Sequence, residues 1–234
     1  MIAAIMQPYL LPYIGYFQLI AAADVFVILD DVQYIRRGWI NRNRILLNGE
    51  PHWLTLPVAY AEQETKIIEM QYQLDDAALR KVGNQLDAAY RKAPQRDAMQ
   101  PLLDQVLGAS DSNVARFNTA GLRRVCEALG VGTPMVAASE MGRDTELKAQ
   151  AGLIDICRRL GADHYVNAAG GVDLYQAAAF AEQGLALSFI RSEAPPYRQF
   201  GAPFVANLSI ADLLMFCGPE QLAEQMAAYR LVAA

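Results

Sequence analysis

The sequence is poor in the residues on which disulfides and zinc sites depend. It has three cysteines and two histidines in 234 residues. Cys126, Cys157 and Cys217 lie far apart in apolar surroundings and form no CxxC pair. A disulfide framework is therefore not expected, and a reducing compartment is the simpler interpretation. Since His52 and His164 have no cysteine at a spacing familiar from zinc sites, we predict no metal site.

Positive charge is also in short supply. The chain has 20 Lys and Arg against 25 Asp and Glu, a net charge of −5. Its overall electrostatics therefore predict no general affinity for nucleic acid or for an anionic membrane surface. An apolar fraction of 53% with 19% charged residues is typical of a globular protein. The length lies between one and two domains, and we expect a single α/β domain spanning residues 1–234.

Charge is absent altogether from Met1–Ala23, so a signal peptide and a membrane helix must be considered. No basic region precedes the apolar run, as a signal peptide requires. Pro8 and Pro12 would interrupt a spanning helix, and the segment also carries glutamines and tyrosines. We predict neither, and expect a cytoplasmic protein with no membrane insertion.

Short apolar runs alternate with helical patterns along much of the chain, as in a parallel α/β sheet. The predicted strands are Ile2–Met6, Val25–Leu29, Trp53–Val58, Met135–Ser139, His164–Asn167 and Leu185–Ile190. The predicted helices are Ile14–Ala23, Asp75–Tyr90, Ala98–Leu107, Asn113–Leu129, a helix from Asp144 or Thr145 to Leu160, Asp173–Gln183, Ser209–Phe216 and Pro219–Tyr229. The expected fold is a Rossmann-like parallel sheet flanked by helices, with a mainly helical insertion or cap over residues 75–129.

Three polar segments follow predicted strands: Gln7–Tyr16, Asp30–Arg44 and Asn167–Gly171. Ligands bind outside the carboxyl ends of the strands in open parallel sheets, so we expect these segments to converge on one site. The first and third can bring backbone amides and phenol hydroxyls to a substrate. Proline-stiffened core packing explains the first segment equally well, and simple turn geometry explains the third. The candidate residues here are Gln7, Tyr9, Tyr13, Tyr16, Asn167, Gly170, Gly171 and Tyr175.

The Asp30–Arg44 segment is the richest in functional side chains. Arginine forks suit phosphate and carboxylate oxygens, aromatic rings stack on a base or a sugar, and a carboxylate can act as a general base or a metal ligand. The alternative is a solvated loop with surface ion pairs. The candidate residues are Asp30, Asp31, Gln33, Tyr34, Arg36, Trp39, Asn41, Arg42, Asn43 and Arg44.

The strings M-Q-P-Y-L-L-P-Y-I-G-Y-F-Q-L-I and D-V-F-V-I-L-D-D-V-Q-Y-I-R-R-G-W-I-N-R-N-R-I resemble the WbqC-like protein family. Later similarities are L-G-A-D-H-Y-V-N-A-A-G-G-V-D-L-Y, Tyr197–Gln199 and N-L-S-I-A-D-L-L. The resemblance covers nearly the whole chain. It implies a role in bacterial surface polysaccharide, that is, lipopolysaccharide and O-antigen, biosynthesis.

A weaker resemblance concerns the HxGH nucleotidyltransferases and class I aminoacyl-tRNA synthetases. A strand, a proline loop, Y-I-G-Y opening a helix and a second strand follow their layout, with Tyr13 and Tyr16 at the two histidine positions. A neutral phenol carries no positive charge to offset reacting phosphates, and no K-M-S-K-S partner follows. The scaffold could instead bind a nucleotide, a nucleotide sugar or an activated acyl group.

The leading hypothesis is a transferase that moves an acyl or aminoacyl group onto a nucleotide-linked amino sugar. In it Arg36, Arg42 and Arg44 hold phosphate, Trp39 and Tyr34 stack, and Asp30, Asp31 and Tyr16 are the catalytic candidates. The expected partners are a nucleotide sugar and an activated acyl donor, with a tRNA-charged donor as the one nucleic-acid option. The alternatives are an HxGH-like nucleotidyl- or adenylyl-transferase and a non-catalytic assembly or binding subunit. The sequence names no cofactor.

Overall fold

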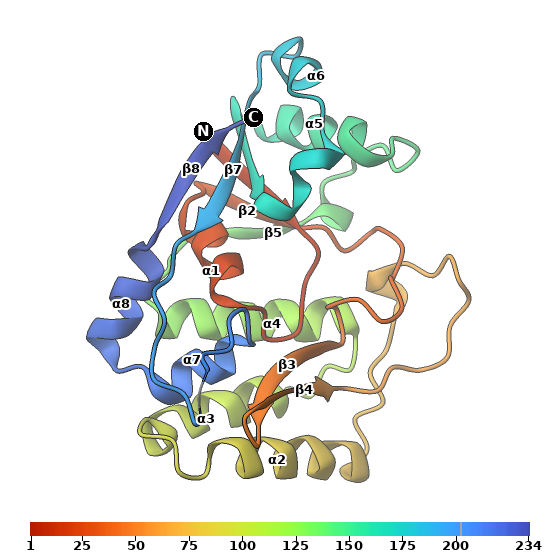
Figure 1. The fold of residues 1–234 in the computed structure, drawn as a ribbon. Helices are drawn as coiled ribbons and strands as arrows, with labels where there is room; N and C mark the ends of the chain where they lie inside the picture. The colour runs from red at the N-terminus through yellow and green to blue at the C-terminus, as the bar shows by residue number, and fades with distance from the viewer. Residues whose placement is uncertain (202) are drawn as a thin grey trace.

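The computed structural model describes residues 1–201 and 203–234, and its centre is a six-stranded sheet (Figure 1). The strand order is β5-β2-β1-β6-β7-β8, with all neighbours parallel except β8, which pairs antiparallel with β7. The strands are β1 (Ile2–Met6), β2 (Val25–Ile28), β5 (Met135–Ala137), β6 (His164–Ala168), β7 (Ala186–Ser192) and β8 (Tyr229–Ala233).

The apolar runs of the inner strands form buried strands because both faces of the sheet are covered by helices. The helices are α1 (Ile14–Ala21), α2 (Asp76–Tyr90), α3 (Arg96–Leu107), α4 (Val114–Ala128), α5 (Ala149–Leu160), α6 (Ala177–Ala181), α7 (Ile210–Phe216) and α8 (Pro219–Ala227). In β1, Ala3 and Ile5 face a cluster that includes α5 and α6, whereas Ala4 faces a cluster that includes α1 and α4. Alternation along one strand therefore contributes to two cores.

The chain order creates a switch point beside β1. The chain runs outward from β1 to β2 and β5, and then returns to place β6 on the other side of β1. The loops that follow β1 and β6 thus leave the sheet in opposite directions, and a crevice forms between them at the carboxyl ends of the strands.

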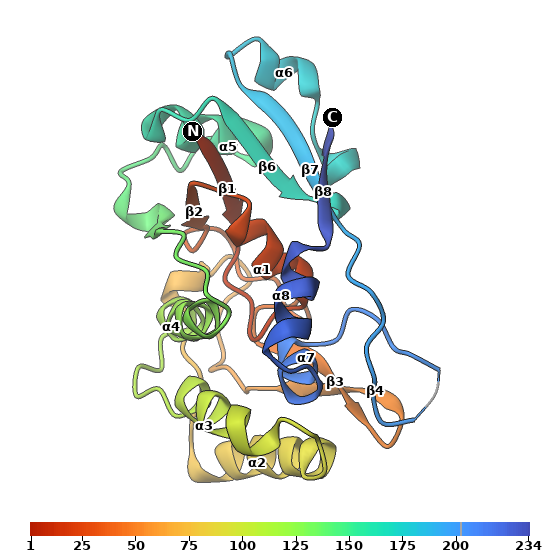
Figure 2. The same ribbon diagram turned by 90° about the vertical axis from the view of Figure 1, so that its left-hand side faces the viewer.

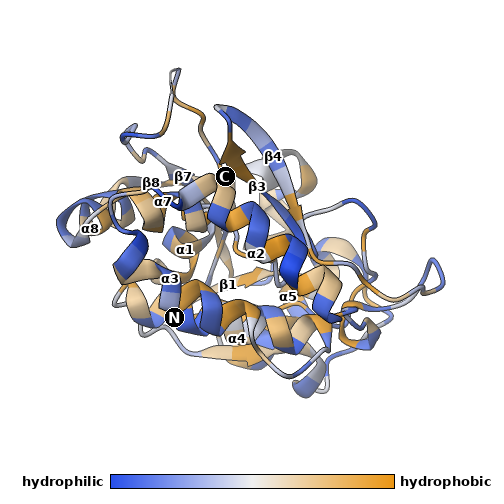
Figure 3. Cartoon of the chain, turned by 90° about the horizontal axis from the view of Figure 1, so that it is seen from below, coloured by the Kyte–Doolittle hydropathy of each residue, from blue (hydrophilic) through white to orange (hydrophobic). Residues whose placement is uncertain are grey.

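The helices α2, α3 and α4 form the helical middle of the chain; α2 and α3 lie at the end of the molecule away from the sheet, and α4 lies between them and the sheet (Figure 2). Asp75 caps α2 by accepting from the amide of Ala78, and Asn113 caps α4 by accepting from Arg116. Blue and orange residues alternate along α2 and α4 in Figure 3, the pattern of amphipathic helices. Their apolar faces share one hydrophobic cluster with α1 and the sheet, which favours a single domain.

A separate hairpin, β3 (Arg42–Leu47) and β4 (Glu50–Thr55), stands beside the sheet. Its turn is Asn48-Gly49, with φ of 53° and 80°. Asn-Gly is the commonest two-residue hairpin turn, because both positions tolerate positive φ. Short 3₁₀ segments complete the fold: Ile67–Glu69, Ala138–Glu140 and Ala169–Leu174. In the part of the chain with assigned structure, no helix has both the length and the apolar character to cross a bilayer.

The prediction of an α/β fold with a parallel sheet and a helical middle is confirmed. Several local predictions were wrong. Strands β3 and β8 were not predicted, and the strand predicted at Trp53–Val58 is β4, Glu50–Thr55. The helix predicted over Asp173–Gln183 is only α6, Ala177–Ala181, α5 begins at Ala149 rather than near Asp144, and the helix predicted to reach Tyr229 ends at Ala227. Strand β8 is a half-exposed edge strand held by β7, a distant pairing that local sequence does not encode.

Candidate functional site

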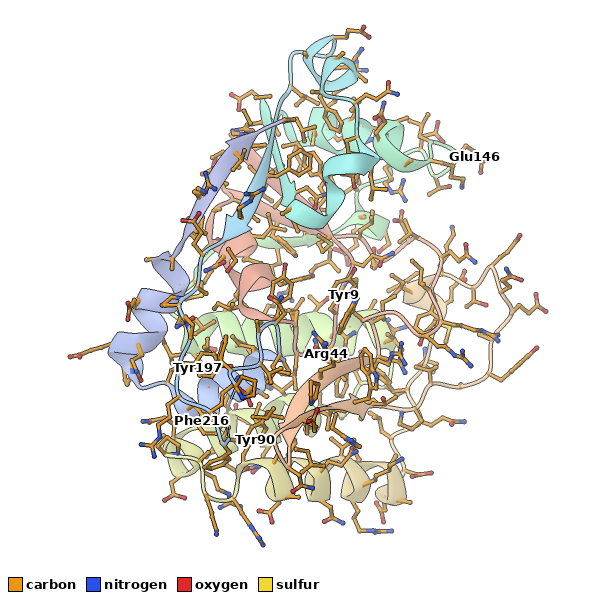
Figure 4. The ribbon with its side chains drawn as sticks, viewed as in Figure 1. Tyr9, Arg44, Tyr90, Glu146, Tyr197 and Phe216 are labelled. Carbon is orange, nitrogen blue, oxygen red and sulfur yellow. The ribbon has the colours of Figure 1, made fainter. Side chains whose placement is uncertain are left out.

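A cavity of 580 Å³ opens at the switch point. Met6 and Ala168, the last residues of β1 and β6, both line it, so it lies where the geometry of the sheet predicts a ligand. Tyr9 and Arg44 lie together between the sheet and the β3–β4 hairpin (Figure 4). The lining residues are Met6, Tyr9, Pro12, Tyr13, Tyr16, Leu19, Trp39, Asn43, Arg44, Asn167, Ala168, Gly170, Gly171, Leu174, Tyr175 and Asn207.

The first wall is the tyrosine-rich loop between β1 and α1. The Tyr16 hydroxyl donates to the backbone oxygen of Gln7 at 2.7 Å, which ties the loop to α1. A Cβ at Gly15 would lie 2.5 Å from the Tyr13 ring, so glycine there lets this ring cover the start of α1. Burial raises the pKa of Tyr9 and Tyr13, and raises that of Tyr16 well above its usual value. These phenols stay neutral at physiological pH.

Two side chains from segments distant in sequence hold this loop in place through hydrogen bonds. Asn43 on β3 donates to the backbone oxygens of Leu10 and Leu11, at 3.1 and 3.0 Å. Ser209, at the start of α7, also donates to Leu11, at 2.8 Å. Leu11 has a φ of 42°, a conformation that L side chains seldom adopt. The hairpin and α7 therefore stabilise a strained turn in the cavity wall.

Arg44 is the one cationic side chain that lines the cavity in the described chain. Its Nη2 reaches the backbone oxygen of Asn207 at 3.4 Å, and its guanidinium lies 5.7 Å from the centre of the Trp39 ring. Its Nε is buried with no hydrogen-bond partner among the described residues. The Arg44 side chain is only partly buried and lines the cavity, so the accessible part of its guanidinium can bind an anion there.

The opposite wall follows β6. Asn167 donates to the Tyr175 hydroxyl at 3.0 Å and accepts from the amide of Ala168 at 2.7 Å. A Cβ at Gly171 would lie 2.9 Å from Asn167 Nδ2 and 3.0 Å from the Tyr175 ring. Glycine at this position therefore makes room for the Asn167–Tyr175 pair. Burial raises the pKa of Tyr175, which keeps its phenol neutral.

Asp30 and Asp31 are not among the residues that line this cavity. They lie toward the β5 edge of the sheet, between the end of β2 and the segment after β5. Asp30 accepts from the amide and hydroxyl of Ser139, at 3.0 and 2.7 Å. Asp31 forms a two-pronged ion pair with Arg143, both contacts at 2.7 Å. Only 7% of the Asp31 side chain and 5% of that of Arg143 is exposed, so the pair is fully enclosed.

Several other candidate residues line a second, smaller cavity of 350 Å³ beside the hairpin. They are Tyr34, Arg36, Asn41 and Arg42. Asn41 accepts from the Tyr34 hydroxyl and donates to Leu56, both at 2.8 Å, which fixes the wall of this cavity. Gln33 donates to the backbone of Gln63 and lines neither cavity, and Gln7 contributes its backbone oxygen to Tyr16.

The structure thus brings ten of the candidate residues to the main cavity: Tyr9, Tyr13, Tyr16, Trp39, Asn43, Arg44, Asn167, Gly170, Gly171 and Tyr175. It adds six that the sequence did not indicate as site residues: Met6, Pro12, Leu19, Ala168, Leu174 and Asn207. Strand ends gave a usable signal for Met6 and Ala168. Asn207 is the first residue of the N-L-S-I-A-D-L-L string, and no pattern in the sequence indicated that this string would reach the cavity.

That string is also bonded to Tyr197–Gln199. Asp212 on α7 is fully buried and accepts from Tyr197 at 2.6 Å, Gln199 at 2.9 Å and Tyr90 at 3.2 Å. Burial raises the pKa of Asp212 more than these three donors lower it. The network fixes the segment that carries Asn207 to the edge of the cavity. Among the described residues, no group of three or more His, Cys, Asp or Glu side chains could hold a metal ion.

A model of the WbqC-like protein family matches residues 7–224, which includes both walls of the cavity and the Asp212 network. The chain belongs to the WbqC-like protein family. This WbqC-like protein is also 29% identical over 222 residues to Rv1507c, an uncharacterized protein of Mycobacterium tuberculosis (strain ATCC 25618 / H37Rv). That match spans 93% of this chain and 94% of the relative. No solved structure matches the chain.

Proposed function

We propose that this WbqC-like protein binds a nucleotide-linked amino sugar in the main cavity and transfers an acyl or aminoacyl group to its amine. The product would be used for bacterial surface polysaccharide. The observation that carries the proposal is the Arg44 guanidinium, the one cation among the described residues that line the switch-point cavity. A phosphate oxygen is a strong acceptor for such a donor, and the guanidinium fork suits phosphate geometry.

The remaining lining suits the sugar. Tyr9, Tyr13 and Tyr175 are neutral phenols that donate or accept single hydrogen bonds, as sugar hydroxyls require. Their rings, and that of Trp39, also offer flat apolar surface for a sugar face. The volume of 580 Å³ lies within the range of small-molecule sites.

In the proposed reaction the sugar amine attacks the acyl carbonyl carbon. A C–N bond forms, the bond to the leaving group breaks, and the leaving group takes the proton that the amine loses. The protein contributes mainly by holding amine and carbonyl in the reactive geometry. Asp30 and Asp31 are bonded to Ser139 and Arg143, so we assign them to supporting the β2–β5 edge. Tyr16 supports the loop through Gln7.

Calorimetric titration with UDP-, dTDP- and GDP-linked amino sugars tests the binding step. Arg44→Met should weaken binding by about 10- to 100-fold, the usual effect of losing hydrogen bonds to a charged group. Arg80→Met is the matched control, because Arg80 is exposed and pairs only loosely with Asp76, at 3.7 Å. If no nucleotide sugar binds, or if the Arg44 and Arg80 variants bind equally well, the proposal is wrong.

The second candidate is a non-catalytic binding subunit, favoured by the engagement of both carboxylates with other residues. Mass spectrometry separates the two candidates. The bound sugar is incubated with acyl donors, and a mass increase of one acyl group supports the transferase. Binding with no mass increase from any donor supports the subunit. Release of pyrophosphate from a nucleoside triphosphate would instead support the nucleotidyl-transferase alternative.

A further inference from the structure

A strip of two adjacent indoles with a guanidinium at each end runs from the main cavity to the second cavity. We define the Arg–Trp strip as Arg44, Trp39, Trp53 and Arg42. Strand alternation explains it. In β3, Arg42 and Arg44 point away from the core that holds Asn43, and Trp53 lies directly opposite Arg44 on β4. The R-N-R string therefore places two guanidiniums on the outer face of the hairpin.

Each side chain of the Arg–Trp strip lies against the next one along it. Arg44 lies 5.7 Å from the Trp39 ring centre, the two indole centres are 5.3 Å apart, and Arg42 lies 4.1 Å from the Trp53 ring. Trp39 and Trp53 remain 38% and 39% exposed, which is a large exposed fraction for bulky aromatic residues. An exposed aromatic surface held by cations is typical of an interaction site.

The far end of the strip opens into the second cavity. Arg36, Arg37 and Arg42 line it together with the Tyr34 and Tyr60 rings, and Glu62 is the one acid among its described lining residues. This is a local excess of positive charge in a chain whose net charge is −5. Its volume of 350 Å³ suits one nucleotide end rather than a run of bases.

We propose that the second cavity and the Arg–Trp strip bind the acyl donor, an acyl thioester carried on a phosphorylated adenine nucleotide, as in acyl-coenzyme A. Arg36, Arg37 and Arg42 hold the phosphates, because three guanidiniums complement several adjacent negative charges. The thin arm of the donor lies over Trp53 and Trp39. The acyl group arrives at Arg44, where the strip meets the main cavity.

The transfer step rests on the proposed function, and its atoms balance. The sugar amine attacks the thioester carbonyl, a C–N bond forms and the C–S bond breaks. The departing sulfur takes the proton released by the amine and leaves as a thiol. No redox partner is required. Trp39 and Arg44 line the cavity that holds the sugar, so the two substrates meet at the end of the strip.

Intrinsic fluorescence tests the binding directly, because Trp39 and Trp53 are the two tryptophans of the chain. Acetyl-coenzyme A should shift their emission to the blue, since its arm removes exposed indole from water. Adenosine 3′,5′-bisphosphate should compete for the same site with a smaller shift, because it lacks the arm. Dephospho-coenzyme A should bind about 10- to 100-fold more weakly, through the loss of one phosphate.

Two variants locate the site. Arg37→Met removes an exposed guanidinium of the second cavity, and Trp53→Ala removes the centre of the strip and leaves Trp39 as reporter. Each should weaken acetyl-coenzyme A by about 10-fold or more, whereas the control Arg80→Met should not. Trp53→Phe should restore much of the affinity. Thermal unfolding of each variant checks that the hairpin is intact.

The proposal is overturned if acetyl-coenzyme A causes no shift, or if Arg37→Met binds as tightly as the wild type. A single-stranded RNA ending in CCA that displaces acetyl-coenzyme A with higher affinity would also overturn it. All titrations are made without the sugar. Failure here with intact, Arg44-dependent sugar binding rejects this donor alone, and loss of sugar binding rejects the proposed function.

Discussion

Two polar regions lie at the carboxyl ends of the sheet, and they differ in whether their charged groups already have partners. At the β2–β5 side, the Asp31 carboxylate is closed by Arg143 and the Asp30 carboxylate by Ser139. At the β1–β6 side, Arg44 lines a cavity, and its guanidinium has one long hydrogen bond among the described residues, to Asn207 at 3.4 Å. A charge whose hydrogen-bonding atoms are all paired within the chain has little left for a ligand and is costly to unpair, whereas a weakly paired charge at a cavity is available to a ligand.

The comparison also shows why residue type is a weak guide to the site. Adjacent carboxylates are more suggestive of chemistry than a lone arginine, yet it is the arginine that lines the cavity. Whether a charged side chain is available to a ligand depends on the residues that it is already bonded to, and those residues are distant in sequence. Arg143 lies 112 positions from Asp31, and Ser139 lies 109 positions from Asp30.

The largest expected effect follows from breaking the buried ion pair. Asp31→Asn should leave the Arg143 guanidinium uncompensated in a site where only 5% of it is exposed, and should lower the free energy of unfolding by about 3–5 kcal/mol. Urea denaturation measures this. The matched control is Asp87→Asn, whose pair with Arg96 is 2.8 Å long but partly exposed. That pair should contribute at most about 1 kcal/mol.

A catalytic role for Asp31 would give the opposite pattern. Transfer activity would then disappear in Asp31→Asn while its urea midpoint stayed at the wild-type value. The Asp31 carboxylate would then be a catalytic group rather than a structural one, and the contrast between the two regions would be lost.

A smaller effect is expected at Asp30. Ser139→Ala removes the hydroxyl donor at 2.7 Å and keeps the amide donor at 3.0 Å. A hydrogen bond to a charged group contributes about 1.5–3 kcal/mol, and stability should fall by that amount. Ser112→Ala is the control, since its hydrogen bond to Gln71 is exposed and joins neutral groups. An unchanged Ser139→Ala would mean that Asp30 is not held by Ser139 in solution.

The sequence predicted the buried strands and the helical middle, because these depend on local patterns. Whether the polar segments meet depends on long-range packing, and the structure places Asp30 and Asp31 away from the main cavity. Apolar runs and amphipathic periods mark β1, β2 and α2, and Gly161 ends α5 with a φ of 68° as its position predicts. The alternation in R-N-R fits a strand with two faces, although β3 was not predicted from it. It could not specify which face would meet a cavity, since Asn43 is turned inward by contacts with Leu10 and Leu11.

At the β1–β6 side, a charge substitution should scarcely alter stability. Among the described residues, the Nε of Arg44 has no partner and its Nη2 has one long hydrogen bond, to Asn207 at 3.4 Å. Arg44→Met should therefore leave the free energy of unfolding within about 1 kcal/mol of the wild type. The same variant should lose nucleotide-sugar affinity. Urea denaturation in the absence of ligand is the measurement. A loss comparable to that of Asp31→Asn would show that Arg44 is a structural cation, and the contrast between the two regions would disappear.

The smallest expected effect is a change in pH dependence caused by Asp212, a buried carboxylate whose partners are neutral donors. Burial raises its pKa in the folded protein, whereas the unfolded value is about 3.9. Its stabilising contribution is therefore complete below the unfolded pKa and is lost as the pH rises through the folded pKa. Compared with Asp212→Asn, the wild type should become relatively less stable as the pH rises through this window. Urea unfolding of both proteins across the window measures the difference, in which any constant cost of the substitution cancels. A difference that moves in the opposite direction would mean that Tyr197 and Gln199 stabilise the carboxylate more than burial penalises it, and this network would then resemble the closed β2–β5 side.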